Sequence, residues 1–166
     1  MLNFQNIISS LTCIVTGLMS DLFFAYSTSV SPGLKNISDA ASLASMQSIN
    51  RVIQNPIFFM VFFGALILLP LNCYLQYERP VTVRSGLFLA AALVYITGAF
   101  GVTILGNIPL NNTLDKFDLS NASPESMRSM RNLFETRLNN LNLVRTLAST
   151  ISFAMLILAL LFSKRV

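Results

Sequence analysis

Four long apolar runs, each with at most one charged side chain, constrain this 166-residue chain more than any other feature. They occupy residues 7–26, 52–77, 85–114 and 146–163. About 20 apolar residues in a helix suffice to cross the hydrocarbon core of a bilayer. Charged residues make up 11% of the chain, against about 25% in soluble domains. We therefore predict an all-α integral membrane protein, a four-transmembrane-helix bundle that forms a single domain over residues 1–166.

The charges around the spans bear on orientation. Four spans place both termini on one side of the membrane, and Arg79, Arg84, Lys164 and Arg165 lie on that side, close to span ends. The excess of basic residues on cytoplasmic loops favours a cytoplasmic location for these termini, which we predict. The basic residues of the two long connections favour the opposite orientation; they are Lys35, Arg51, Lys116, Arg128, Arg131 and Arg137.

The first long connection has the pattern of an amphipathic helix. Residues 38–55 place Leu43, Met46 and Ile49 at helical spacing beside a polar stripe. Pro56 then ends or kinks the segment where the second span begins, because proline disfavours a helical residue before it.

The second long connection also predicts an amphipathic helix. Ser123 and Pro124 fit an N-cap and a first-turn proline, and an apolar stripe follows as far as Leu141. No helix breaker separates this segment from the fourth span, so one helix over residues 124–162 would be about 58 Å long. Its first half must project from the hydrocarbon or bend along its surface. We expect the two amphipathic helices to pack together over the end of the bundle.

The reactive side chains exclude several classes of site. The chain has no His, so it has no Ser-His-Asp triad and no His-ligated metal. Cys13 and Cys73 lie in separate apolar runs and form no CxxC pair or zinc cluster, so we predict reduced cysteines and no metal site. The 11 Lys and Arg residues form no concentrated basic face, which excludes nucleic acid as a partner and favours anionic lipid headgroups.

Two charged residues at the spans, Asp21 and Arg145, are the candidate catalytic groups. Asp21 shares a helical face with Cys13 and Gly17, and its carboxylate either faces an internal cavity as a proton acceptor or lies in the wet interface at a helix end. Arg145 begins the fourth span and shares a face with Asn142. Its guanidinium either points between helices toward a carbonyl, a carboxylate or a bound anion, or extends to the headgroups.

Amide side chains are the candidate ligand-binding groups. Asn107, Asn111 and Asn112 flank Pro109 after the third span, where they either support a tight turn or border a ligand. Since antiparallel spans would bring this predicted loop to the level of the fourth span's start, we expect one polar cluster there. The predicted ligand-binding residues are Asn50, Arg51, Asn107, Asn111 and Asn142.

Four sequence blocks resemble the anthrone oxygenase-like membrane proteins, many of which are bacterial. Residues 17–34 (GLMSDLFFAYSTSVSPGL) resemble the family's first helix and following turn, and residues 46–56 (MQSINRVIQNP) its second block. Residues 106–112 (GNIPLNN) and 142–146 (NLVRT) are similar to the third and fourth. The blocks follow the family's order over nearly the whole chain. The resemblance implies a location in the bacterial inner membrane.

The resemblance also implies an oxygenase that converts an anthrone to an anthraquinone without a metal, a flavin or any other cofactor. In such chemistry the substrate supplies the electrons after losing a proton, and the protein provides a base, a donor for the oxyanion and a dry pocket. Asp21 would be the base, Arg145 the donor, and the amides would orient the substrate. This chain has no Trp before its Asn-x-x-Arg element, where family members commonly carry tryptophans, and has Asp21 where a small residue is expected.

The implied partners are the lipid bilayer and a lipophilic aromatic small molecule. The alternative function is that of a non-catalytic membrane protein that binds lipid or a partner helix, forms a homo-oligomer, or serves as a subunit of a membrane assembly. A small molecule that co-purifies with the protein would favour the first class over the second.

Overall fold

The computed structural model describes residues 3–162, and these residues form helices and short turns with no strand. Four helical rods are long and apolar enough to cross a membrane: Phe4–Lys35, Pro56–Leu75, Val83–Asp115 and Pro124–Leu161. The predicted four-span helical fold is thereby confirmed, and the helices indicate an integral membrane location. Lys164 and Arg165, which entered the orientation argument, lie outside the described residues, as do Met1 and Val166.

Two of the rods contain π-helical segments. The first rod consists of α1 (Phe4–Ala25), the π segment η1 (Tyr26–Val30) and α2 (Ser31–Lys35). The third consists of α5 (Val83–Tyr95), the π segments η2 (Ile96–Gly101) and η3 (Thr103–Asn107), and α6 (Ile108–Asp115). The second and fourth rods are single helices, α4 (Pro56–Leu75) and α7 (Pro124–Leu161).

The loop predicted around Asn107, Asn111 and Asn112 is wrong, because these residues continue the third rod as helix. A proline in a helix lacks an N–H and clashes with the carbonyl four residues before it. Here the turn before Pro109 is widened: the N–H of Ile108 donates to the carbonyl of Thr103, five residues back. The N–H of Ser31, which precedes Pro32, donates to the carbonyl of Tyr26 in the same way. The wider turn lets each rod pass its proline without a break.

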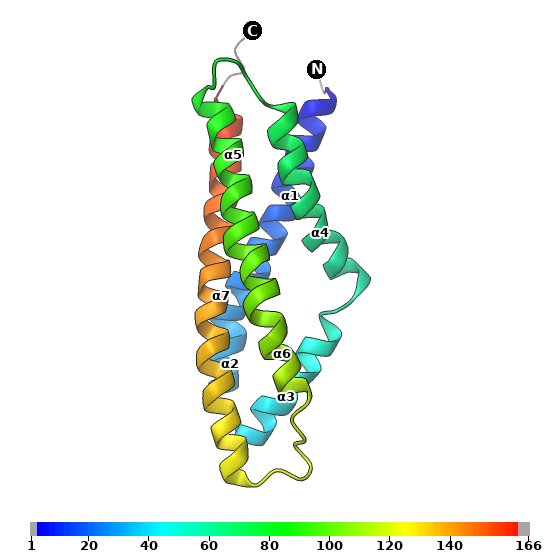
Figure 1. Ribbon diagram of the computed structural model, residues 1–166, viewed down its shortest axis with the longest axis vertical. Coiled ribbons are helices and arrows are strands. Elements are labelled where there is room, and N and C mark those ends of the chain that lie inside the picture. The colour runs from blue at the N-terminus through cyan, green and yellow to red at the C-terminus, as the bar shows by residue number, and fades with distance from the viewer. Residues whose placement is uncertain (1–2, 163–166) are drawn as a thin grey trace.

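The four rods form an elongated bundle (Figure 1). The start of α1 and the end of α7 lie at one end of the bundle, which we call the terminal end, together with the turn that joins α4 to α5 (Figure 1). Helix α3 (Asp39–Val52) lies at the opposite end, the α3 end (Figure 1). With 38 residues, α7 is about 57 Å long, so it extends well beyond a hydrocarbon core of about 30 Å.

Both amphipathic helices are confirmed. Ser38 caps α3 by accepting a hydrogen bond from the N–H of Ala41, and Ser123 caps α7 with Pro124 in the first turn. Helix α3 ends at Val52, and Asn55 caps α4 before Pro56. The apolar stripes of the two helices share one buried cluster at the α3 end, which contains Leu43, Met46, Leu110, Leu114, Phe134 and Leu138.

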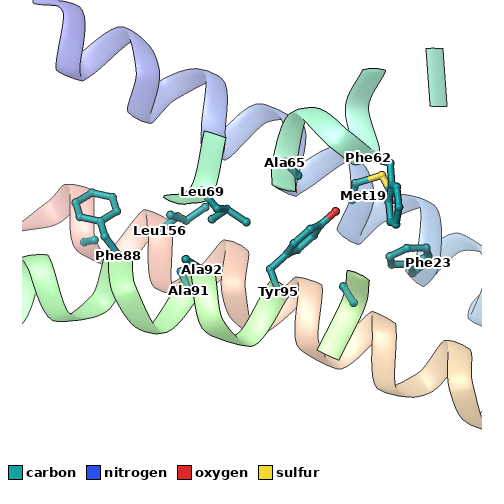
Figure 2. Close-up of a cluster of buried hydrophobic side chains, with 12 residues drawn as sticks. Met19, Phe23, Phe62, Ala65, Leu69, Phe88, Ala91, Ala92, Tyr95 and Leu156 are labelled. Carbon is teal, nitrogen blue, oxygen red and sulfur yellow. The ribbon is translucent and has the colours of Figure 1, made fainter. Parts of the chain in front are cut away.

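A second buried cluster fills the bundle between the four rods (Figure 2). It is built from aromatic side chains and alanines, with Tyr95 and Phe88 among its most deeply buried members. The Tyr95 hydroxyl points toward the side of the cluster formed by Ala65, Met19 and Phe62 (Figure 2). The outward side chains of the rods are large and apolar, for example Leu18, Ile67, Leu93 and Ile151, as a lipid-facing surface requires.

Candidate functional site

The interior of the bundle becomes polar where α7 passes α1 near the α3 end, and Asn142 is at the centre of this region. Its side chain is 1% exposed, and its Nδ2 donates to the carbonyl of Phe23 at 3.0 Å and to Oγ of Ser27 at 2.7 Å. These bonds fasten α7 to the first rod. Asn142 therefore has a structural role whether or not it also meets a ligand.

Arg145 lies one turn further along α7 and points inward. Its Nη2 donates to Oδ1 of Asn142 at 2.7 Å, and its guanidinium lies 4.4 Å from the centre of the Phe23 ring. The guanidinium also interacts electrostatically with Tyr26 on η1. Its Nε is buried and has no hydrogen-bond partner among residues 3–162. Of the two predicted orientations, the inward one is therefore observed, and the Nε–H donor of the guanidinium is unused within that part of the chain.

Further unpartnered amides lie toward the α3 end of the bundle. The side chain of Asn107 is 2% exposed, and neither its Oδ1 nor its Nδ2 has a partner within the described part of the chain. Oδ1 of Asn111 and Nδ2 of Asn50 are likewise buried without a partner there. A buried amide normally makes its hydrogen bonds, and an unmade one costs about 1 to 3 kcal/mol. Such a group of amides suits a polar ligand or ordered water.

The positions of these amides follow from how the rods pack. Gly106 lies against Leu141, since a Cβ on Gly106 would be 2.7 Å from Cδ2 of Leu141. The residues that follow, Asn107 on the third rod and Asn142 on the fourth, are therefore at the same level of the bundle. Nε2 of Gln47 donates to the carbonyls of Leu114 and Phe117 at 2.8 and 2.9 Å, which fixes α3 against the end of α6.

Arg51 does not join this interior group. Its Nε donates to Oδ1 of Asp115 at 2.7 Å, and the two side chains are 62% and 50% exposed. This ion pair closes the outer side of the contact between α3 and α6. Because exposed pairs contribute about 0 to 1 kcal/mol, it holds α3 only weakly.

Asp21 lies on the opposite face of α1 from Phe23, and its side chain is exposed on the outside of the bundle. It makes no hydrogen bond or ion pair with any residue from 3 to 162. The structure therefore does not bring Asp21 and Arg145 together. A catalytic role for either residue stays a prediction.

A small cavity lies between the first rod, α3 and α7. Its volume is about 10 Å³, which is roughly the space for one water molecule. Tyr26 and Glu135 both line it. The Tyr26 hydroxyl donates to Sδ of Met46 at 3.7 Å, and Glu135 pairs with Arg131 at 3.1 Å. Neither Tyr26 nor Glu135 stood out in the sequence, because each fits an ordinary amphipathic pattern.

Two arginines that the sequence suggested only as surface charges form ion pairs with carboxylates of other segments or of their own helix. Arg131 donates to the carbonyls of Leu34 and Ile37 and pairs with Asp39 and Glu135, so it joins the turn before α3 to α7. At the terminal end, Arg84 is 7% exposed.

Arg84 has a carboxylate and a ring as neighbours. It pairs with Glu78 at 3.3 Å and lies over the Phe88 ring. A charge four residues before an aromatic on a helix was the available signal for this contact.

No group of three Cys, Asp or Glu side chains among the described residues is arranged to hold a metal ion. The buried polar groups around Arg145 are instead amides and hydroxyls, together with its own guanidinium. This set offers several donors but no interior carboxylate next to Arg145. It suits an uncharged polar or an anionic ligand.

Comparison with known proteins gives one match. The family model described as Anthrone oxygenase matches residues 57–155, which is more than half of the chain. The matched region includes Asn107, Asn111, Asn142 and Arg145, whereas Asp21, Asn50 and Arg51 precede it. No curated protein and no solved structure matches the chain.

Proposed function

The chain belongs to the anthrone oxygenase family, and from this premise we propose that it oxidises a lipophilic aromatic molecule whose deprotonated form is bound by Arg145. The observation that carries the proposal is the buried Nε of Arg145, which has no partner within residues 3–162 and lies on an inward-facing guanidinium. An anion bound here would accept the hydrogen bond that Nε of Arg145 leaves unmade. The unpartnered amides at the same end of the bundle supply further donors.

The proposed reaction balances without an external reductant. An anthrone loses a proton from its methylene carbon, and the negative charge is shared with its carbonyl oxygen. The carbanion reacts with dioxygen to form a C–O bond, and the resulting peroxide loses water to give the second carbonyl. The sum is anthrone plus dioxygen to anthraquinone plus water. The protein's task is to stabilise the oxyanion and accept the proton.

We assign these tasks to residues that the bundle holds inside. Arg145 would bind the oxyanion, with Asn107 and Asn111 as neighbouring donors. Glu135, which lines the small cavity together with Tyr26 and pairs with Arg131, would accept the proton. Glu135 takes the place that the sequence suggested for Asp21, since Asp21 faces away from Arg145.

Substrate entry requires an opening at the α3 end. Sites for small organic ligands measure about 300 to 1,000 Å³, whereas the cavity beside Tyr26 holds about 10 Å³. We assign the movement to helix α3, which would have to give up the exposed Arg51–Asp115 pair and the two hydrogen bonds of Gln47 to the end of α6. A molecule dissolved in the bilayer would reach the opening at the membrane surface.

The test is oxidation of 1,8-dihydroxyanthrone by the purified full-length protein in detergent. The rate is measured both as dioxygen uptake and as the increase in anthraquinone absorbance. The spontaneous oxidation rate without protein is subtracted. We expect Arg145→Leu to lower the protein-dependent rate at least 100-fold, which corresponds to about 2.7 kcal/mol, and Arg145→Lys to retain part of it. Glu135→Gln is expected to lower the rate about tenfold or more.

The matched control is Arg128→Leu, which removes an exposed guanidinium from the same helix. It should leave the rate unchanged. Thermal stability of each variant separates a chemical effect from loss of folding. The proposal is wrong if wild type does not exceed the spontaneous rate, or if a stably folded Arg145→Leu retains the full rate.

We also propose that the protein resides in a bacterial inner membrane with its terminal end in the cytoplasm. The support is the exposed Arg79 in the turn between α4 and α5, close to two span ends. A membrane-impermeant maleimide should label Arg79→Cys only in broken cells. Labelling in intact spheroplasts would show that the terminal end faces the periplasm.

A further inference from the structure

A groove runs between α1 and α7 on the outer surface of the bundle. Its volume is about 450 Å³, and its lining is apolar apart from the carboxylate of Asp21 and the thiol of Cys13. Phe153 and Ile157 of α7 form one wall, and Leu18 of α1 forms part of the other. The groove opens toward the lipid and not toward the interior amides.

Asp21 lies within the hydrocarbon region. The neighbouring Ser20 bonds to Thr150 of α7 at 2.8 Å, so Asp21 is close to the level of Thr150. The outward side chains of α7 change from polar to apolar at Leu143, seven residues before Thr150. At 1.5 Å per residue this places Asp21 about 10 Å inside the hydrocarbon boundary.

A carboxylate at this depth is costly unless it is paired or shielded. The lining of the groove and the bonds within residues 3–162 give Asp21 no such partner. The two inward arginines, Arg84 and Arg145, are engaged elsewhere. The cost is therefore not offset within the described part of the chain.

Helix α7 packs closely against α1 beside this groove. Cys13, Gly17 and Asp21 follow one another at intervals of four residues, so they lie on one face of α1. A Cβ on Gly17 would be 3.1 Å from the Phe153 ring, so Phe153 closes the floor of the groove beside the glycine. Small residues at this spacing let a second helix approach closely in a membrane.

Charge complementarity decides what this face would bind. The large side chains that the rods expose at the level of Asp21 are apolar, among them Leu147, Ile151, Phe59 and Leu93. A second copy of this chain would therefore present no basic group to Asp21. We propose that the groove docks a transmembrane helix of a different protein that carries a Lys or Arg side chain opposite Asp21.

The proposal does not depend on the oxidation proposed above, because the groove and the interior amides lie on opposite sides of α1. It predicts a membrane complex in which α1 and α7 are the contact surface. The charged pair would fix the depth and register of the incoming helix, as buried polar groups do between helices in lipid.

The test uses synthetic transmembrane peptides and exploits the absence of Trp from this protein. Two leucine-rich peptides carry one Trp each and differ only in having Lys or Leu at a position about 10 Å from the hydrocarbon boundary. Each is mixed with the full-length protein in phosphatidylcholine vesicles, and the anisotropy of Trp emission reports binding of the peptide. We expect the Lys peptide to bind about tenfold more tightly than the Leu peptide.

Asp21→Asn keeps the size of the side chain and should abolish the preference for the Lys peptide. Asp118→Asn is the matched control, because it removes an exposed carboxylate from a turn outside the spans, and it should preserve that preference. Equal binding of the two peptides, no binding of either, or an undiminished preference in a folded Asp21→Asn variant would each overturn the proposal. Equal binding of the two peptides, or no binding of either, would indicate that lipid chains fill the groove.

Discussion

The two deeply buried asparagines of the third and fourth rods should respond in opposite directions to the same substitution. Leu has the branching and the heavy-atom count of Asn but no polar atoms. Asn142 makes two hydrogen bonds to the first rod and accepts one from Arg145. Asn107, at the same level of the bundle, makes none through its side chain within residues 3–162.

The expected magnitudes follow from this difference. Neutral hydrogen bonds contribute about 0.5 to 1.5 kcal/mol each and charged ones more, so Asn142→Leu should destabilise the protein by about 3 kcal/mol. Asn107→Leu removes two unsatisfied atoms, each costing about 1 to 3 kcal/mol, against an overpacking cost of similar size. We expect a net stabilisation of about 1 kcal/mol. With about 2 to 4 °C per kcal/mol, the melting temperature should fall by roughly 6 to 12 °C in the first variant and rise by roughly 2 to 4 °C in the second.

The assay is thermal unfolding in detergent with a maleimide dye that becomes fluorescent on reaction with Cys13 and Cys73, both of which are free. If the Asn107 amide awaits a substrate, the stabilised Asn107→Leu variant should also lose oxidation of 1,8-dihydroxyanthrone, as expected where a site trades stability for activity. A fall in melting temperature for Asn107→Leu as large as that for Asn142→Leu would refute the reasoning, since it would mean that the Asn107 amide is already satisfied.

Three further predictions concern packing, a buried ion pair and pH. Gly98→Ala should destabilise the bundle by about 1 to 3 kcal/mol, because the added Cβ would be 2.5 Å from Cβ of Ala148. The control Gly86→Ala meets nothing within 4 Å and should be neutral or stabilising by up to about 1 kcal/mol. Equal melting temperatures of the two variants would contradict this prediction. Glu78→Leu should cost about 3 kcal/mol by leaving Arg84 buried without its carboxylate, and an unchanged melting temperature would show that the pair contributes nothing. Hydrogen bonds from Ser120 and Asn121 lower the pKa of Asp118 from 3.8 to about 2, so their stabilising effect is present above pH 3.8 and is lost as the pH falls from there through about 2. Carboxyl NMR should show Asp118 titrating near pH 2 and Ser120→Ala shifting the titration upward; a wild-type midpoint near 3.8 would exclude these bonds.

The helices were predictable wherever local signals agreed. Ser123 and Pro124 mark the start of α7, and no breaker follows, so its continuity into the fourth span was evident from sequence. The loop at Pro109 was predicted wrongly because a proline is ordinarily a helix breaker, whereas here a hydrogen bond from Ile108 to the carbonyl of Thr103, five residues back, widens the turn and admits it.

The candidate site was predictable in composition but not in arrangement. The phase of Arg145 relative to Asn142 indicated the inward orientation as one of two possibilities, and the structure shows that one, whereas the outward position of Asp21 depends on how α1 is rotated against α7. Rotation of a helix about its axis is set by long-range contacts such as Ser20 with Thr150. Tyr95 was not singled out from the sequence, and its buried hydroxyl has no partner among the described residues.

The π-helical turns before Pro32 and Pro109 have a consequence for how relatives of this chain should be aligned. Each turn accommodates one residue more than an α-helical turn, and one residue corresponds to about 100° of rotation. A relative that lacks the proline can delete that residue and keep the later side chains on the same faces. One-residue gaps are therefore expected at residues 26–30 and 103–107, inside the first and third rods, where alignments ordinarily forbid them.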